Sequence, residues 1–208
     1  GTAFRAYEPA HALSAERNRR EGRHYDPART EESMQHLMAL FASADEEIDP
    51  LTDDRPTPIF IVGMPRSGTT LVESMLAAHS HVRAGGERPQ MQQLLNAYLE
   101  LADVGQLHRL ETSLLQKWRE AYFADFRVTG TANHFTDKNP LNFEAAGLIA
   151  RIFPDAIIIH LRRNPVETCF SIYRNEFSKF WTFTDRLEDI GHYYGRYARL
   201  VSHWERVL

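Results

Sequence analysis

The spacing of apolar residues changes along the chain in a way that separates strands from helices. Short continuous apolar runs predict strands at 58–62 and 155–161, with a shorter strand at 82–84. Apolar residues at helical spacing predict helices at 69–79, 89–101, 111–126, 141–153, 165–177 and 185–207. Because the two kinds of element alternate, we expect a parallel α/β sheet flanked by helices. The run at 155–161 suits a strand that is buried on both faces.

The first part of the chain is helical in pattern and differs from the alternating region. Residues 1 to about 49 carry apolar positions near helical spacing, and Asp26-Pro27 fits a helix start with proline just inside. The following stretch, "DEEIDPLTDDRPTP", is acidic and interrupted by prolines, as is typical of a linker. We therefore predict a helical N-terminal arm and linker over 1–54 and an α/β domain over 55–208. The last helix reaches "WERVL" without a stop signal, so we expect the domain to continue past Leu208.

Composition places the chain among ordinary globular proteins. It has 208 residues, of which 43% are hydrophobic and 25% charged. The net charge of -4 implies no general attraction to nucleic acid or membranes, so any anion site must be local. No apolar run is long enough for a membrane span. A single cysteine, Cys169, excludes an intrachain disulfide and favours a reducing compartment, from which we expect a cytoplasmic location.

The segment "FIVGMPRSGTTLVESML" has the order strand, phosphate loop and helix. Backbone N–H groups at 67–70, with the nearby hydroxyls, would bind a terminal anion. A Walker loop has lysine after its second glycine, whereas this chain has Thr69 there and places the loop cation earlier, at Arg66. The alternative is an ordinary glycine turn that carries a surface arginine.

The strong apolar run "DAIIIHL" is followed by "RRNP". A nucleotide hydrolase would need a carboxylate at a strand end to help hold magnesium, but this run ends in His160, Arg162 and Arg163. Two arginines between a strand and a helix favour a second anion site, although they also fit a solvated pair. The predicted ligand therefore carries two separated anionic groups and needs no metal ion.

Two anion sites without a metal carboxylate match 3′-phosphoadenosine 5′-phosphosulfate (PAPS). "VGMPRSGTTLVESMLAAHSHV" resembles the 5′-phosphosulfate loop of the sulfotransferases, and "RRNPVETCFSIYRNEF" is similar to their 3′-phosphate motif of arginine and serine. The resemblance covers about residues 56 to 208 and is closest to bacterial sulfotransferases with tetratricopeptide repeats and to tyrosylprotein sulfotransferases. It implies PAPS as co-substrate, PAP as product, and a P-loop-like fold. The implied cofactor contacts are Pro65, Arg66, Ser67, Gly68, Thr69, Thr70, Arg163 and Ser171.

The same resemblance implies three catalytic residues. "RAGGERP" is similar to the segment that supplies the base in tyrosylprotein sulfotransferases, which places the base at Glu87, and "TDKNPLN" is similar to the family's lysine segment at Lys138. The loop arginine falls on Arg66. Those relatives also have an arginine four residues after the motif serine, where this chain has Asn175 and the arginine is Arg174.

These residue types suit sulfuryl transfer, which we treat as an in-line displacement like phosphoryl transfer. Arg66 and Lys138 would stabilise the charge that builds on the leaving phosphate, without a metal. Glu87 would accept the proton of the acceptor hydroxyl, and burial of its carboxylate would suit that role.

Each of these residues also fits a structural role. Glu87 fits the first turn of the next helix, and Lys138 fits an Asn-Pro turn. The lone histidines at 79, 81, 134 and 160 are candidate bases that are more often structural, and Cys169 fits packing. The aromatic segment 173–183 fits either a wall of the acceptor site or core.

The predicted function is transfer of a sulfuryl group from PAPS to an acceptor hydroxyl. A peptide tyrosine, another phenol, a glycan and a lipid all remain open as acceptors, with Glu87 favouring a peptide or phenol. Two alternatives also stay open: a P-loop nucleotide kinase or NTPase with a displaced cation, and a non-catalytic nucleotide-binding scaffold. We expect no nucleic-acid partner, and the oligomeric state is not predicted.

Overall fold

The structure, a computed structural model, groups the chain into two compact units. It describes residues 2–42, 55–106, 112–124, 126, 132–175, 177 and 181–208. One unit joins Gly1–Ala39 to Arg163–His203, and the other joins Leu40–Arg162 to Trp204–Leu208. The predicted division into 1–54 and 55–208 stays a prediction, because its boundary lies at 43–54, outside the described residues.

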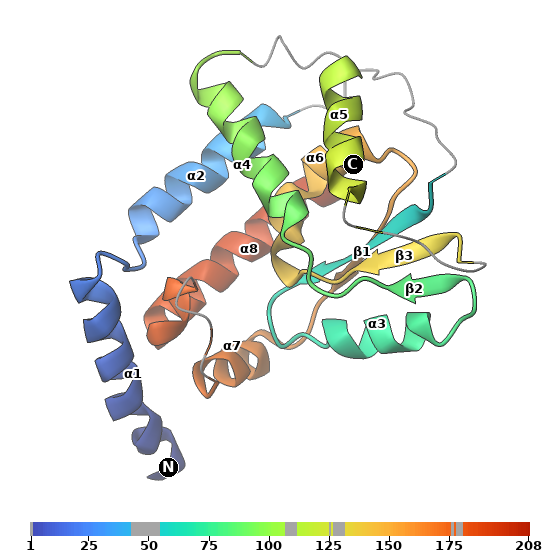
Figure 1. Cartoon of the computed structure of the whole chain (residues 1–208). Coiled ribbons are helices and arrows are strands. Elements are labelled where there is room, and N and C mark those ends of the chain that lie inside the picture. Colours follow the sequence, from blue (N-terminus) through green and yellow to red (C-terminus); the bar gives the residue numbers. More distant parts are fainter. Residues whose placement is uncertain are drawn as a thin grey trace. The chain divides into compact units, whose positions relative to one another are not determined.

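The larger unit is built on a four-stranded parallel sheet in the order β2-β3-β1-β4 (Figure 1). Its strands are β1 (Thr57–Gly63), β2 (Val82–Ala84), β3 (His134–Asp137) and β4 (Ile157–Leu161). The register places Phe60 opposite Asp137 and Gly63 opposite Leu161. Because all pairs are parallel, the four strands end at the same edge of the sheet. The predicted parallel α/β class is confirmed.

Three of the four described strands agree with the prediction. The missed strand and the wrong prediction of burial for β4 both have physical reasons. β3 was not predicted, because "HFTD" is short and half polar. β4 was predicted to be buried on both faces, and this is wrong. In the described sheet β4 pairs with β1 on one side, Ile157 is 46% exposed, and its other residues are half-buried. An apolar run indicates a strand but not its position in the sheet.

Helices cover both faces of this sheet (Figure 1). They are α3 (Thr69–Ala77), α4 (Gln90–Asp103), α5 (Thr112–Phe123) and α6 (Ala146–Ile152), with the 3₁₀ helix η2 (Pro140–Ala145) before α6. The predicted helix at 141–153 is therefore divided into η2 and α6. Successive side chains of a strand point to opposite faces, so Thr136 meets α3 while Phe135 and Asp137 meet Tyr122 of α5.

Aromatic rings fill the α5 side of the core. The Tyr122 ring lies 4.8 Å from that of Phe153 and 5.8 Å from that of Phe60, between ring centroids. All three side chains are buried. Burial of such large apolar surfaces is the main favourable contribution to the folding of this unit.

The other unit is helical. It contains α1 (Thr2–Arg20), α2 (Pro27–Leu40), α7 (Pro165–Tyr173), the 3₁₀ helix η3 (Thr182–Asp185) and α8 (Leu187–Val207). The last residue of α2 and the part of α8 from Trp204 onward are assigned to the sheet unit. Asp185 ties η3 to α1 by accepting hydrogen bonds from Ser14 Oγ at 2.9 Å and Asn18 Nδ2 at 2.7 Å. Across the helices of the described ranges, none is both long and apolar enough to cross a membrane.

Gly147 of α6 provides a test of the packing in the sheet unit. A Cβ atom at this position would lie 2.6 Å from Cδ1 of Phe41, whose ring stacks on Tyr98 and contacts Trp204. Because this ring is held on several sides, we expect Gly147→Ala to lower the free energy of unfolding by about 1–3 kcal/mol. Urea unfolding measures it.

Two exposed glycines of α8 serve as controls for the helix preference of alanine. Among the residues that the structure describes, none has an atom within 4 Å of a Cβ built on Gly191 or Gly195. Alanine there should leave stability unchanged or raise it by up to about 1 kcal/mol. If Gly147→Ala behaves like these controls, the Phe41 ring is not held as described.

Candidate active site

The loop between β1 and α3 has the backbone geometry of an anion-binding loop. Arg66 has a φ of 68°, which is uncommon for a residue with a side chain, and Gly68 begins α3 with no side-chain cap. The first N–H groups of a helix have no acceptor inside it, so the amides at Gly68 and Thr69 are directed out of the helix. The buried hydroxyl of Ser67 has no hydrogen-bond partner among the described residues. This geometry fits a bound anion.

The residues of this loop differ in exposure. Pro65 and Thr69 are buried, whereas Arg66, Gly68 and Thr70 are exposed. Arg66 is therefore accessible to a ligand that approaches from solvent. The predicted ligand contacts of these residues stay a prediction.

The structure brings Glu87 and Lys138 together. Glu87 follows β2, Lys138 follows β3, and these strands are neighbours, so the two side chains meet at the edge where both strands end. Nζ of Lys138 donates to Oε1 of Glu87 at 2.5 Å. The Lys138 side chain is 9% exposed and that of Glu87 is 57% exposed. An ammonium group is therefore held beneath a carboxylate that faces solvent.

The structure contradicts the structural alternative for Glu87 but not the one for Lys138. α4 begins at Gln90, so Glu87 lies before the helix and not in its first turn. Lys138 directly precedes the Asn-Pro start of η2, as that alternative expects, and it is buried and ion-paired. Glu87 is, however, more exposed than the burial that we expected for a base.

The candidate histidines lie elsewhere. His79 and His81 precede β2, and His134 begins β3, where its N–H donates to the His81 carbonyl at 3.1 Å. These residues are therefore at the amino edge of the sheet, opposite to Glu87. His160 lies within β4, and burial lowers the pKa of its imidazole. This placement disfavours His79, His81 and His134 as replacements for Glu87.

A carboxylate does end a strand, contrary to our expectation. Asp137 is the last residue of β3, which was missed with its strand. Its side chain is fully buried and Oδ2 accepts a hydrogen bond from the Tyr122 hydroxyl at 2.7 Å. Asp137 therefore points into the α5 side of the core. Among the described ranges, no three His, Cys, Asp or Glu side chains gather in a way that could hold a metal ion.

The predicted 3′-phosphate residues belong to the helical unit. The guanidinium of Arg163 donates to Oε2 of Glu167 from Nε at 3.0 Å and from Nη2 at 2.8 Å. Asn164 caps α7 by accepting from the Glu167 N–H, and Ser171 is buried in that helix. The structure thus pairs Arg163 with Glu167, and the contact of Arg163 and Ser171 with a phosphate stays a prediction.

The residues that depart from the sulfotransferase pattern have structural roles. Nδ2 of Asn175 donates to the Ser171 carbonyl at 2.6 Å, which satisfies an acceptor near the end of α7. The Arg174 guanidinium lies 5.8 Å from the centre of the Phe170 ring, a cation–π contact. Cys169 is half-buried, and burial raises the pKa of its thiol, as expected of a packing residue.

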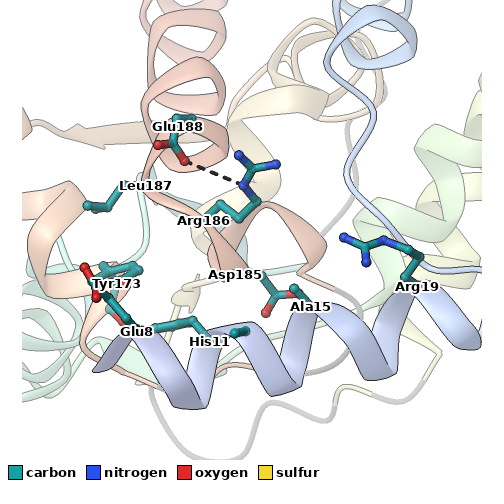
Figure 2. Close-up of a pocket in the computed structure, with 10 residues that line it drawn as sticks. Glu8, His11, Ala15, Arg19, Tyr173, Asp185, Arg186, Leu187 and Glu188 are labelled. Atoms are coloured by element: carbon teal, nitrogen blue, oxygen red, sulfur yellow. Dashed lines mark hydrogen bonds and ion pairs between the residues drawn. The ribbon is translucent and has the colours of Figure 1, made fainter. Parts of the chain in front are cut away.

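A cavity of about 550 Å³ lies in the helical unit, and Figure 2 shows its lining. It is formed by α1 together with Tyr173 and the segment from Asp185 to Glu188. None of the predicted catalytic or nucleotide-binding residues lines it. Its walls carry both acidic and basic groups, including an ion pair between Arg186 and Glu188 at 3.6 Å. The cavity is therefore not a site that selects anions.

The aromatic segment 173–183 contributes to this unit in two ways. Tyr173 lines the cavity and its ring stacks on His11 at 4.1 Å. Phe183 stacks on Tyr193 at 3.9 Å and belongs to the core. Residues 176 and 178–180 lie outside the described residues.

The fold and the loop define a class of protein: a parallel α/β domain with a loop after β1 whose geometry fits a bound anion. Within this class, a sequence model described as the sulfotransferase family matches residues 58–208. The chain belongs to the sulfotransferase family.

Similarity to individual proteins supports this family assignment. An uncharacterised protein of Aquifex aeolicus (strain VF5) is 35% identical over 73% of this chain and 22% of its own length. The protein-tyrosine sulfotransferase of Drosophila melanogaster is 32% identical over 55% of this chain and 24% of its own. Protein-tyrosine sulfotransferase 1 of Danio rerio is 28% identical over 65% of this chain and 41% of its own. The chain thus spans less than half the length of these relatives.

Asp137 makes the stability of the fold dependent on pH. Burial raises the pKa of its carboxyl from 3.8 to about 6. Between these values the folded protein binds more protons than the unfolded chain, so this carboxyl lowers stability as the pH rises from about 4 to about 6. A pKa difference of about two between the folded and unfolded states corresponds to about 3 kcal/mol.

The variant Asp137→Asn should lack this pH-dependent loss of stability, because an amide does not ionise. Its oxygen still accepts the hydrogen bond from Tyr122. We expect the free energy of unfolding of the variant, relative to that of the wild type, to be about 2–3 kcal/mol higher at pH 7 than at pH 4, so that the variant gains relative stability as the pH rises. Urea unfolding across this range measures the difference. Parallel pH profiles would contradict the assignment.

Proposed function

We propose that this chain carries the catalytic part of a PAPS-dependent sulfotransferase that acts on a phenolic hydroxyl, such as a peptide tyrosine. The observation that carries the proposal is the Glu87–Lys138 pair, an exposed carboxylate over a buried ammonium at the edge where the strands end. Membership of the sulfotransferase family supports the reaction class. The protein-tyrosine sulfotransferases among its relatives support a phenol as acceptor.

The donor would be bound by its charged groups. The amides at the start of α3 and the Ser67 hydroxyl are suited to the 5′-phosphosulfate, because they offer donors without a counter-charge. Arg163 and Ser171 are assigned to the 3′-phosphate. Arg163 would then exchange Glu167 for the phosphate, and because both of these side chains are substantially exposed, their ion pair is weak and little free energy is lost in the exchange.

In the proposed reaction, the acceptor oxygen forms a bond to sulfur while the bond from sulfur to the bridging phosphate oxygen breaks. The hydroxyl proton goes to Glu87, and the electron pair of the broken bond stays on the phosphate of PAP. Lys138 and Arg66 stabilise the negative charge that grows there. No metal is assigned a role.

The geometry of Glu87 suits a large acceptor. Its side chain is more than half exposed, so a tyrosine that projects from a peptide can approach it without entering a closed cavity. Oε1 is engaged by Lys138, and within the described ranges Oε2 has no hydrogen-bond partner. A phenol, with a pKa of about 10, needs such a base near neutral pH, and an aliphatic alcohol needs it more.

The variant Glu87→Gln tests the base. We expect kcat for a tyrosine peptide to fall by roughly 100-fold or more, with the affinity for PAP nearly unchanged, because the amide cannot accept the proton. The acidic limb of the pH–rate profile should disappear. Steady-state kinetics over a pH series and calorimetry with PAP provide the measurements.

A nitrophenol acceptor is the internal control for this variant. Such a phenol is already ionised near neutral pH, so the loss caused by Glu87→Gln should shrink. A loss of equal size for acceptors of different pKa would assign Glu87 a positional role instead.

Two other results would favour the alternative functions. Binding of PAP without transfer to any hydroxyl would favour a non-catalytic module, and stabilisation by ATP with magnesium but not by PAP would favour a kinase or NTPase.

The variant Arg163→Ala tests the assignment of the 3′-phosphate. It should weaken PAP binding by about 30-fold or more, as for loss of a charge-assisted hydrogen bond, and barely affect adenosine 5′-phosphosulfate, which lacks that phosphate. Arg162→Ala is the matched control, since it removes the neighbouring arginine. Equal losses for both ligands, or equal effects of both variants, would show that Arg163 does not bind the 3′-phosphate.

A further inference from the structure

Glu73 is a buried acidic residue that neither anion site uses. It lies on the sheet-facing side of α3, four residues after the buried Thr69, and only 8% of its surface is exposed. A carboxylate in such a place is costly unless its oxygens accept hydrogen bonds. The donors that bond to the Glu73 carboxylate therefore indicate which parts of the structure it holds in place.

Both hydrogen bonds to Glu73 come from the elements that carry the Glu87–Lys138 pair. Oε1 accepts the Gly86 N–H at 3.0 Å and the Thr136 hydroxyl at 2.7 Å. The Thr136 oxygen in turn accepts the Gly85 N–H at 3.2 Å. Two consecutive amides before Glu87 are therefore held by one carboxylate oxygen and one hydroxyl.

The turn is held on its other side by Lys138. The backbone N–H of Lys138 donates to the Gly86 carbonyl at 2.8 Å, in addition to the side-chain contact with Glu87. Gly86 is thus fixed through both its N–H and its carbonyl. Because Glu87 is the next residue, its Cα position is fixed as well, and only its side-chain torsions remain variable.

Glycine is required at both positions of this turn. A Cβ atom on Gly85 would lie 2.2 Å from the Thr136 carbonyl oxygen, and Gly86 has a φ of 70°, in the left-handed region. The backbone approaches β3 so closely that an amide left unpaired here would be shielded from water. Such an amide costs free energy, and Glu73 and Thr136 supply its acceptors.

From this geometry we propose that Glu73 is a positioning residue for catalysis, which fixes the turn at Gly85–Gly86 and thereby holds the Glu87 carboxylate over Lys138. It touches neither reacting group and acts through the turn. The inference rests on the proposed function, because it needs Glu87 as the base. The hydrogen bonds themselves do not depend on that function, so the two are tested separately.

Two pairs of variants isolate the hydrogen bonds from the general effect of a core substitution. Glu73→Leu and Thr136→Val remove the acceptor or the hydroxyl at similar volume. Glu73→Gln and Thr136→Ser keep an oxygen that is able to make the same bonds. The first readout is the hydrogen-exchange rate of the Gly86 amide, measured by NMR in the full chain. This measurement does not require the protein to be active.

We expect the Gly86 amide to exchange at least 10-fold faster in Glu73→Leu and to stay near the wild-type rate in Glu73→Gln, with urea unfolding used to correct for global stability. In kinetics with a tyrosine peptide, Glu73→Leu should lower kcat by roughly 10- to 100-fold, with PAP affinity nearly unchanged, because a small displacement of a base is costly. The loss should shrink for a nitrophenol, as for Glu87→Gln. In the double variant with Glu87→Gln, Glu73→Leu should add no further loss.

Different results separate the positioning role of Glu73 from the proposed function. An unchanged exchange rate for Gly86, or losses that add fully in the double variant, would overturn the positioning role while leaving the proposed function intact. Equal losses for Glu73→Gln and Glu73→Leu would also overturn it, since the amide keeps the acceptor oxygen. Faster exchange in Glu73→Leu, together with a wild-type protein that transfers no sulfuryl group, would reject the proposed function and leave the hydrogen-bond network standing.

Discussion

The pairing of β3 with β1 on one side and β2 on the other is the constraint on which the candidate site depends. This four-residue strand sets where Lys138 leaves the sheet, and its pairing with β2 sets where Glu87 arrives. The same strand points Thr136 toward Glu73 and Asp137 toward Tyr122. One face of β3 therefore supports the turn beside the site, while the other is tied into the aromatic core. A shift of one residue in register would exchange these roles and separate the pair.

Polar side chains on both faces of β3 are buried, and the two faces form different hydrogen bonds. On the α3 side the acceptor is a carboxylate that bonds a hydroxyl and an amide. On the α5 side the Tyr122 hydroxyl donates to Asp137, whose ionised form is disfavoured by burial, as its raised pKa indicates. The Arg88 guanidinium lies 5.1 Å from the centre of the Tyr122 ring and donates to the Tyr122 carbonyl at 2.7 Å. Hydrogen bonds of this kind favour one packing arrangement, because a shift of β3 would break several of them at once.

Sequence patterns predicted the elements that have strong local signals. β1, α3 and the loop between them follow from an apolar run, a glycine turn and helical spacing, all within one short segment. β3 escaped because a strand of four residues with two polar side chains has too little periodicity, and its polar residues serve neighbours distant in sequence. The roles of Glu73 and Asp137 were missed for the same reason. The meeting of Glu87 and Lys138 was implied by resemblance alone, and no local pattern gives it, since it depends on which strands are neighbours.

The sequence separation within the site has a consequence for the order in which the chain folds. Glu87 and Lys138 are 51 residues apart, as are Gly85 and Thr136, whereas α3 forms through contacts within a few residues. Closing a long loop costs chain entropy before its contacts are made, so contacts of this kind form later than local helices. The loop before α3 is in place once β1 and α3 have joined, but the Glu87–Lys138 ion pair requires β2 and β3 as well. In a partly folded chain the loop after β1 would therefore be formed before the Glu87–Lys138 pair, so that the two parts of the candidate site appear at different stages of folding.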